Sequence, residues 1–224
     1  MLKRLLYIKR MLTVTPIRYR HLLRTIYNKR CQCIMEIGTH SGIHSRHMID
    51  TANIFHPMNR ITYYGFDLFE GLTDEDFQKE FAKKPPEYSE VKQKLERTGA
   101  NVNLYKGYTK DTLPKFLEEN EGRKQIDFVF IDGGHSIETI SLDWSYVKRI
   151  IHTNTVVIFD DYYSNKEVKD SGFGCQALID NLDRDVYDIE ILEPMEHFGG
   201  DTPRDCNMVK VRLNPNRNKN GNIS

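Results

Sequence analysis

Two apolar segments of this chain end abruptly in carboxylates. Phe128–Ile131 (FVFI) is followed by Asp132-Gly-Gly-His135, and Val156–Phe159 (VVIF) is followed by Asp160 and Asp161. Apolar runs rich in β-branched and aromatic residues are typical of strands buried on both faces of a parallel sheet. Ligands bind at the carboxyl ends of such strands. We therefore expect three carboxylates and an imidazole to converge at one sheet edge, which predicts a metal site beside a base.

The predicted metal ligands are Asp132, Asp160 and Asp161. Ligand sets made only of oxygens favour Mg²⁺, Mn²⁺ or Ca²⁺ over zinc or copper. Adjacent strand residues point to opposite faces, so the last two carboxylates can share an ion only if the strand ends before them. The apolar alternation stops at Tyr162, which is consistent with such an end. Helix caps and surface acids are the competing interpretation.

His135 is the predicted catalytic base, because an imidazole titrates near neutral pH. A metal-bound carboxylate, such as Asp132, is the other candidate for accepting the proton. A cap of the following helix is the structural alternative for His135. The ion would stabilise the oxygen anion that develops on a substrate hydroxyl.

A second ligand site is predicted where the first strand meets the first helix, in Glu36-Ile-Gly-Thr-His-Ser-Gly42. Glycines allow a sharp turn, and the free N–H groups of a helix N-terminus attract an anion. That anion is either a dinucleotide pyrophosphate or an amino-acid carboxylate. Gly38 and Gly42 are spaced G-x-x-x-G, which departs from the dinucleotide fingerprint. Glu36 could receive the ammonium of an amino-acid group.

Asp67 ends the second strand, where an acid can accept both hydroxyls of an adenosine ribose. Turn capping is the alternative for this residue. Lys106-Gly107-Tyr108 ends the third strand, where backbone groups and an aromatic face could hold an adenine ring.

The composition is that of a globular protein of one domain with a small appendage: 224 residues, 39% hydrophobic, 29% charged and net charge zero. A neutral chain argues against bulk nucleic-acid binding. The four cysteines lack zinc-type spacing, which favours free thiols in a reducing cytosol. No apolar run is long enough for a membrane span, and no secretory pattern opens the chain. We therefore expect a cytoplasmic protein.

Strand and helix patterns alternate from residue 31, which predicts an α/β fold with a parallel sheet. Pro114 is expected in the first turn of its helix. Two final strands without an intervening helix predict a closing antiparallel pair, joined by a long loop at 193–207. The expected strands are 33–37, 61–66, 102–106, 126–131, 155–159, 187–192 and 208–213, and the expected helices are 43–55, 112–120 and 137–151.

Three segments lie outside this pattern. Residues 1–30 form a basic helical extension without Asp or Glu, suited to core or subunit packing or to an anionic surface. Residues 73–99 are charged and form either a solvated surface or a lid or dimer contact over the crevice. Residues 214–224 are expected to be disordered. The α/β domain is then 31–213.

The motifs taken together resemble those of class I S-adenosylmethionine-dependent methyltransferases, in particular the metal-dependent, macrocin-type sugar O-methyltransferases. The similarity spans about residues 33–165, and the motifs occur in the expected order. The matching pieces are Glu36-Ile-Gly-Thr-His-Ser-Gly42, Gly65-Phe-Asp-Leu-Phe-Glu-Gly71, Lys106-Gly-Tyr-Thr-Lys-Asp-Thr-Leu-Pro114, Ile131-Asp-Gly-Gly-His135 and Ile158-Phe-Asp-Asp-Tyr162.

This resemblance implies a Rossmann-like, seven-stranded sheet, parallel except for one antiparallel C-terminal strand, with helices on both faces. It also implies S-adenosylmethionine as methyl donor and Mg²⁺ or Mn²⁺ as metal. The related catechol-type enzymes carry a lysine in the place of His135. The residues implied at the cofactor are Glu36, Gly38, Thr39, Ser41, Gly42, Asp67, Gly107, Tyr108 and Asp132.

The implied acceptor is a hydroxyl of a sugar or glycoconjugate, such as a deoxysugar. A catechol or phenol is the nearest rival acceptor. A non-catalytic binding module on the same fold and a nicotinamide oxidoreductase are the alternatives from other classes. The sequence also leaves two possibilities open: that the protein forms a homodimer, and that it is a module of a larger glycan-building protein.

Overall fold

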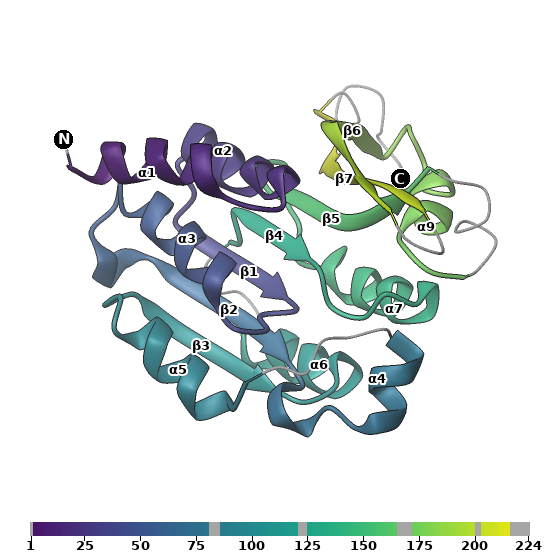
Figure 1. Cartoon of the computed structure of the whole chain (residues 1–224), viewed down its shortest axis with the longest axis horizontal. Helices are drawn as coiled ribbons and strands as arrows, with labels where there is room; N and C mark the ends of the chain where they lie inside the picture. Colours follow the sequence, from purple (N-terminus) through teal and green to yellow (C-terminus); the bar gives the residue numbers. More distant parts are fainter. Residues whose placement is uncertain (1, 81–85, 121–124, 165–171, 200–202, 216–224) are drawn as a thin grey trace, which may run out of the picture.

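The computed structural model describes residues 2–80, 86–120, 125–164, 172–199 and 203–215. Figure 1 shows the chain as a central sheet covered by helices. The elements in chain order are α1 (Leu2–Thr13), η1 (Ile17–Tyr19), α2 (Arg20–Lys29), β1 (Cys33–Ile37), α3 (Ile43–Ala52), η2 (Met58–Arg60), β2 (Thr62–Asp67), η3 (Phe69–Gly71), α4 (Asp74–Glu80), α5 (Tyr88–Glu96), β3 (Asn101–Lys106), α6 (Thr109–Glu119), β4 (Phe128–Ile131), α7 (Ile137–Val147), β5 (Val156–Tyr163), α9 (Gln176–Asp180), β6 (Tyr187–Phe198) and β7 (Arg204–Leu213).

The sheet has seven strands in the order β3-β2-β1-β4-β5-β7-β6. The strands β1 to β5 pair in parallel, and β7 runs antiparallel to both β5 and β6. This arrangement confirms the predicted class I methyltransferase sheet with one reversed strand. The strand order changes direction at β1, so the crevice at the switch between β1 and β4 is where a doubly wound sheet binds its ligand.

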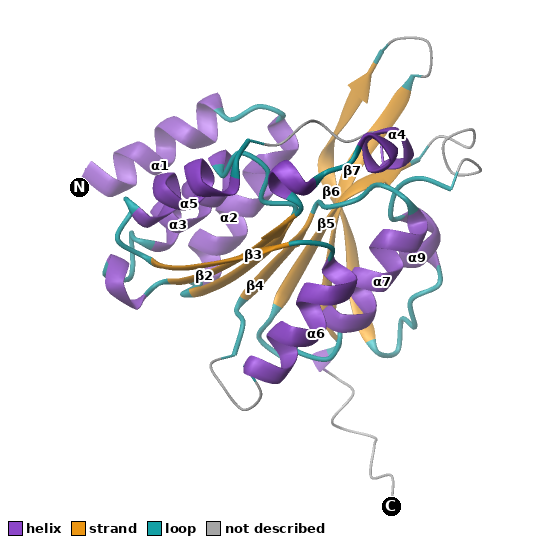
Figure 2. Cartoon of the chain, turned by 90° about the horizontal axis from the view of Figure 1, so that it is seen from below, coloured by secondary structure: helices purple, strands orange, loops and turns teal. Residues whose placement is uncertain are grey.

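Helices cover both faces of the sheet. Figure 2 shows α1, α2, α3 and α5 on one side and α6, α7 and α9 on the other. Residues of the parallel strands alternate between the two cores: Ile34 packs with α2 and α3, whereas Met35 packs with α6 and α7. Burial on both faces is why the central strands are continuously apolar.

The basic N-terminal extension is packed into the first of these cores. Leu22, Leu23 and Ile26 of α2 are each at most 2% exposed. They lie over the sheet beside α3, and Tyr19 at the end of η1 is buried with them. This segment therefore reaches the carboxyl edge of the sheet, where the predicted metal site lies.

The C-terminal hairpin differs from the prediction. Residues 193–207 do not form a long loop, because β6 runs to Phe198 and β7 begins at Arg204. Pro194 lies within β6 and is tolerated there because β6 is the edge strand, where a ladder N–H is dispensable. The ladder register shifts between Leu192 and Glu196, next to that proline.

One smaller expectation is also corrected. Pro114 lies inside α6 and not in its first turn, because α6 begins at Thr109. Most of the tail predicted to be disordered, 216–224, lies outside the described residues. Within the described part of the chain, no helix is both long and apolar enough to cross a membrane. All four cysteines are buried free thiols.

Candidate functional site

The carboxyl ends of β4 and β5 place the predicted carboxylates side by side. β4 and β5 pair in parallel up to Ile131 and Phe159, so Asp132 and Asp160 follow at the same level. β5 does not end there, contrary to the condition set for a shared metal, but continues to Tyr163. The register shifts between Phe159 and Tyr162, and Asp161 adopts a left-handed backbone with φ of 57°. This irregularity lets consecutive carboxylates turn toward one region.

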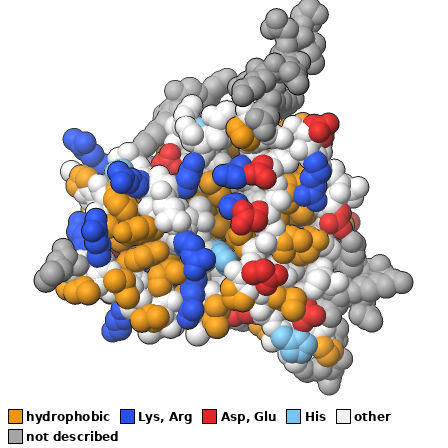
Figure 3. Space-filling model, turned by 90° about the horizontal axis from the view of Figure 1, so that it is seen from above, with side chains coloured by type: hydrophobic (Ala, Val, Ile, Leu, Met, Phe, Trp, Pro, Cys, Tyr) orange, Lys and Arg blue, Asp and Glu red, His pale blue; other side chains and the backbone are white. Residues whose placement is uncertain are grey.

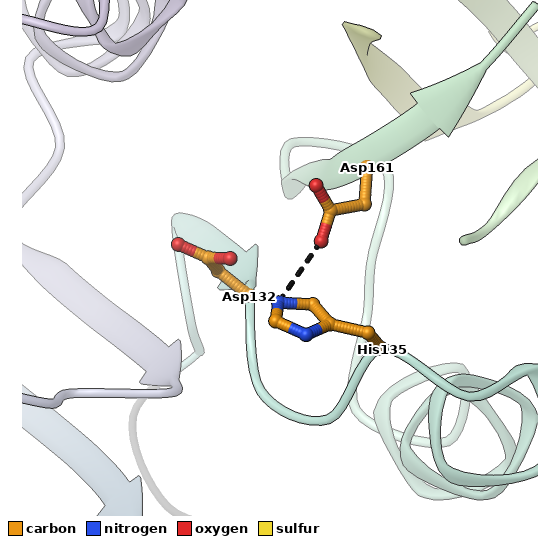
Figure 4. Close-up of side chains that lie close together, drawn as sticks. All are labelled: Asp132, His135 and Asp161. Atoms are coloured by element: carbon orange, nitrogen blue, oxygen red, sulfur yellow. Dashed lines mark ion pairs between the residues drawn. The ribbon is translucent and has the colours of Figure 1, made fainter. Parts of the chain in front are cut away.

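Asp132, His135 and Asp161 form one compact group of potential ligands. One ligand atom of each lies within 4.8 Å of the others. Figure 4 shows the imidazole of His135 pointing at Asp161, with Asp132 beside it at the end of β4. The Nε2 atom of His135 is 3.2 Å from Oδ2 of Asp161. The structure thus brings the predicted base, His135, together with two of the three predicted carboxylates.

The second nitrogen of His135 has a fixed partner. Its Nδ1 lies 2.5 Å from the backbone oxygen of Glu80, which can only accept a hydrogen bond. Nδ1 therefore carries the proton. In the neutral imidazole Nε2 then has a free lone pair directed toward Asp161, and this is the form needed for a base or a metal ligand.

Asp160, the third predicted ligand, is held by a different partner. Arg18 donates to it from Nε at 2.7 Å and from Nη2 at 2.9 Å, a bidentate pair. The hydroxyl of Tyr19 lies 3.0 Å from Asp160 and 2.9 Å from Asp132, so it bridges the two carboxylates. Arg18 also bonds Glu196 of β6 at 2.5 Å. The geometry therefore favours His135 over Asp160 as the third ligand.

The buried charges perturb one another. Burial and the charge of Asp160 raise the pKa of Asp132 well above its usual value and also raise that of Asp161. Burial lowers the pKa of Arg18, but Asp160 raises it more, so the guanidinium stays charged. The raised pKa values mean that the buried carboxyl groups of Asp132 and Asp161 resist ionising beside Asp160 alone, and a bound divalent cation would favour their ionised forms.

The glycine turn predicted for the cofactor lies beside this group. Gly38 has φ of 94°, and a Cβ on it would lie 1.8 Å from the backbone oxygen of Asp132. The glycine is therefore required by the close approach of the β1 turn to the end of β4. Gly42 has φ of 68° at the N-terminus of α3. Thr39 between them is buried, and the carbonyl of Ser41 accepts a bond from Lys94 at 2.7 Å.

Asp67 ties the glycine turn to the end of β2. Its carboxylate accepts the backbone N–H groups of His40 and Phe69, each at 2.7 Å. Burial raises the pKa of Asp67. Each carboxylate oxygen retains a second lone pair, so the group can still accept hydroxyl protons.

The last predicted cofactor residues, Gly107 and Tyr108, follow the end of β3. Gly107 donates its N–H to the backbone oxygen of Asp67 at 3.0 Å and has φ of 132°. Tyr108 follows it with its ring 40% exposed. The predicted cofactor residues thus line up along the ends of β3, β2, β1 and β4.

Glu36 was predicted to receive the ammonium of an amino-acid group, but its side chain is buried in the protein interior. It is 1% exposed and accepts hydrogen bonds from Ser45 at 2.5 Å and from the hydroxyl of Tyr63. Burial raises the pKa of Glu36 to about 8. Its contact with an ammonium group stays a prediction.

Helix α4, from the segment predicted as either surface or lid, crosses this edge. Asp76 accepts a hydrogen bond from the hydroxyl of Tyr108 at 2.9 Å. Glu80 accepts bonds from the N–H and hydroxyl of Ser136 at 2.7 and 2.8 Å, and from Thr139 at 2.8 Å, at the start of α7. The helix thus joins the end of β3 to the end of β4, in the position of a lid. Residues 81–85, which follow it, lie outside the described residues.

Arg18, Tyr19 and Glu196 contact the clustered carboxylates or one another and were not predicted from the sequence. His44 stacks on Tyr19 with ring centroids 4.0 Å apart, and burial lowers the pKa of His44 to about 4. The only signal was the absence of acids around Arg18, which is a composition bias and not a motif.

Comparison with known proteins gives a family and a fold. The chain matches the family described as a methyltransferase domain over residues 35–162, more than half of its length. No curated protein sequence matches significantly. The match begins at β1, so α1, η1 and α2 lie outside it.

Solved structures align over nearly the whole chain. An O-methyltransferase from Bacillus cereus in complex with SAH aligns with a TM-score of 0.59 at 16% identity, covering 95% of this chain and 89% of that one. TomG, an O-methyltransferase of tomaymycin synthesis from Streptomyces achromogenes, bound to SAM, gives 0.58 at 15% over 91% and 82%. CalS11, a TDP-rhamnose 3′-O-methyltransferase of calicheamicin biosynthesis, gives 0.58 at 19% over 92% and 86%.

These identities are low, so the alignments establish the fold and not the acceptor. An N-methyltransferase, NodS from Bradyrhizobium japonicum, also aligns, with a TM-score of 0.55 at 11% identity over 88% of this chain and 94% of that one. The matched family, the strand order and the glycine turn at the switch point agree with one another. The chain belongs to the methyltransferase domain family and has the class I methyltransferase fold.

Proposed function

We propose that this protein is an S-adenosylmethionine-dependent O-methyltransferase that methylates a sugar hydroxyl with the help of a divalent cation. The observation that carries the proposal is the convergence of Asp132, His135 and Asp161 at the switch point of a methyltransferase sheet. S-adenosylmethionine would supply a methyl group on a sulfonium, and structural neighbours were solved with SAM or SAH.

The chain's own residues define where the donor would lie. The Asp67 carboxylate can accept ribose hydroxyls while it keeps its two backbone bonds. Gly107 and Tyr108 flank an adenine position, and the start of α3 faces the carboxylate of the amino-acid end. The backbone of Asp132 adjoins the glycine turn at Gly38, so its carboxylate would lie close to both the donor and the cation.

The cation site fits a divalent ion with mixed oxygen and nitrogen ligands. Asp132 and Asp161 supply oxygens, and Nε2 of His135 supplies a nitrogen. An imidazole ligand shifts the preference from Mg²⁺ toward Mn²⁺, because Mg²⁺ prefers oxygen alone. Asp160 would keep its hydrogen bonds to Arg18 and Tyr19 and would not bind the ion. Through Tyr19 it would help to position Asp132. When bound, the ion would stabilise the negative charge that develops on the acceptor oxygen.

The proton of the acceptor hydroxyl needs a base beside the cation. His135 cannot be both a ligand and the base, because Nδ1 is bonded to Glu80 and Nε2 has a single lone pair. With Nε2 on the cation, the proton would pass to a ligand carboxylate, for which we propose Asp132. Alignment of the two substrates would contribute much of the acceleration, up to about 7–11 kcal/mol.

The proposed acceptor class rests on the polar groups that surround the carboxylates. Arg18, Tyr19 and Glu196 form a hydrogen-bonded polar group with Asp132 and Asp160 beside the proposed cation site. These groups suit a ring carrying several hydroxyls better than a flat phenol. CalS11, which acts on TDP-rhamnose, is the structural neighbour whose substrate has this chemistry.

The test is transfer of a labelled methyl group from S-adenosylmethionine to nucleotide-linked deoxysugars and to catechol, with Mn²⁺, with Mg²⁺ and with chelator. We expect sugar methylation that chelator abolishes and Mn²⁺ restores. Asp132→Asn should abolish turnover while calorimetry still detects donor binding. Catechol methylation alone would refute the sugar assignment, full activity in chelator would refute the cation, and absence of donor binding would support a non-catalytic module.

A further inference from the structure

Helix α1 turns its more apolar face away from the protein. Only Tyr7 and Met11 pack against the core, and no residue of the helix is buried. Lys3 and Arg10 bind the end of α3 instead, through Asn53 and Asp50. A surface helix normally shows the opposite arrangement, with its apolar stripe toward the core.

The outward face carries large aliphatic side chains. At about 100° per residue these positions fall on one half of the helix. Figure 3 shows a continuous apolar area on the corresponding face of the molecule. The exposed residues are Leu2 at 80%, Leu5 at 54%, Leu6 at 42%, Ile8 at 52% and Leu12 at 71%.

The same region concentrates the positive charge of the chain. Residues 1–30 hold 9 of the 32 Lys and Arg residues and none of the 32 Asp and Glu residues. Arg4 and Lys9 of α1 are exposed beside the aliphatic residues. In Figure 3 basic side chains border the apolar area on several sides, while most acidic side chains gather on the other half of the face. Arg18 is buried against Asp160 and Arg10 pairs with Asp50, so the exposed positive charge of α1 comes from residues such as Arg4 and Lys9. These basic residues and the aliphatic side chains give α1 a cationic, apolar surface on a protein of zero net charge.

The exposed aliphatic and basic side chains of α1 distinguish between three possible partners for its outward face. A second copy docking through the same face would bring like charges together. A nucleic acid would satisfy the cations but leave the five aliphatic side chains in water. An anionic phospholipid surface satisfies both, because the aliphatic side chains enter the boundary between headgroups and acyl chains while the cations meet the headgroups.

We propose that the outward face of α1 docks the protein onto an anionic phospholipid surface. The helix would lie in the plane of the interface and would not span it. This inference does not depend on the acceptor or on the cation of the methyl-transfer site.

The test is flotation of the intact protein with vesicles of phosphatidylglycerol and phosphatidylcholine, against vesicles of phosphatidylcholine alone. We expect binding to the anionic vesicles to be stronger by about tenfold or more, and to weaken in high salt. Leu5→Gln/Leu12→Gln removes apolar area and Arg4→Gln/Lys9→Gln removes charge; each should reduce binding by about tenfold or more. Ile191→Gln, an exposed aliphatic residue of β6, is the matched control and should bind normally.

Circular dichroism and donor binding establish that the variants are folded. Equal binding to neutral and anionic vesicles, or no vesicle binding by the folded parent protein, would overturn the proposal. Sedimentation that reveals a dimer dissolved by Leu5→Gln/Leu12→Gln would assign the face to a second copy. Binding of a nucleic acid in preference to vesicles would overturn it as well.

Discussion

The guanidinium of Arg18 and the carboxylate of Asp160 form a bidentate ion pair between the N-terminal segment and β5. Both side chains are almost fully buried, at 7% and 2% exposure. The pair removes one of the three carboxylates from competition for a cation and fixes the Arg18–Tyr19 segment over the site. The segment outside the matched family region is thus part of the proposed active site.

Arg18→Met should destabilise the protein by about 3–5 kcal/mol at neutral pH, because it leaves Asp160 buried without its counter-charge. Arg18→Met/Asp160→Asn should recover much of this loss, since no buried charge is then uncompensated. Urea unfolding of the parent, both single variants and the double variant measures the coupling free energy. Additive effects of the two substitutions would show that the pair is not coupled.

Mn²⁺ should stabilise the folded protein directly. At about a hundred times its dissociation constant, a ligand that binds only the native state adds about 2.7 kcal/mol, or about 5–10 °C in Tm for a chain of this size. Asp132→Asn and Asp161→Asn should each remove most of that shift. Asp111→Asn, at an exposed position on α6, is the control that should keep it. The same shift in all the variants would place the ion elsewhere.

Glu36 should make stability depend on pH. Its pKa is raised to about 8 in the folded state by burial, so the native protein binds the extra proton between its ordinary value of 4.5 and about 8. Stability should therefore fall by a few kcal/mol as the pH rises through that window. Glu36→Gln should flatten this dependence, as measured by urea unfolding at several pH values. Glu138→Gln, at a side chain 81% exposed, should leave the slope intact; identical slopes in Glu36→Gln and the parent would contradict the assignment.

Glu80 should slow release of the demethylated product. Its bonds to Ser136 and Thr139 hold α4 across the cofactor edge, and they outweigh burial in lowering the pKa of Glu80. Glu80→Gln weakens these charge-assisted bonds and should speed dissociation of S-adenosylhomocysteine by about tenfold. Stopped-flow displacement measures that rate, with Glu75→Gln on the same helix as control. A rate unchanged by Glu80→Gln would show that α4 does not gate the site.

The sequence predicted the parts of the site that depend on strand ends. Asp132 and Asp67 each follow an apolar run, and parallel strands place their ends at one edge, so position in the chain was sufficient. The backbone turn at Asp161 was not predictable, because alternation alone assigns it to the face opposite Asp160. The pairing of Arg18 with Asp160 spans 142 residues and leaves no local pattern. The extension of β6 beyond Leu192 was not predicted; it contains Pro194, which an edge strand tolerates.

Arg18 joins Asp160 to Glu196, so the two ends of the chain meet over the predicted reaction centre. During synthesis by the ribosome, the family-matched region at 35–162 emerges well before Glu196 does. The nascent sheet can begin to form early. The bonds of Arg18 to both Asp160 and Glu196 are complete only after the hairpin of β6 and β7 has folded beside the first helices. A chain interrupted before β6 would therefore retain the carboxylate edge and lack the contact that holds Arg18 in place.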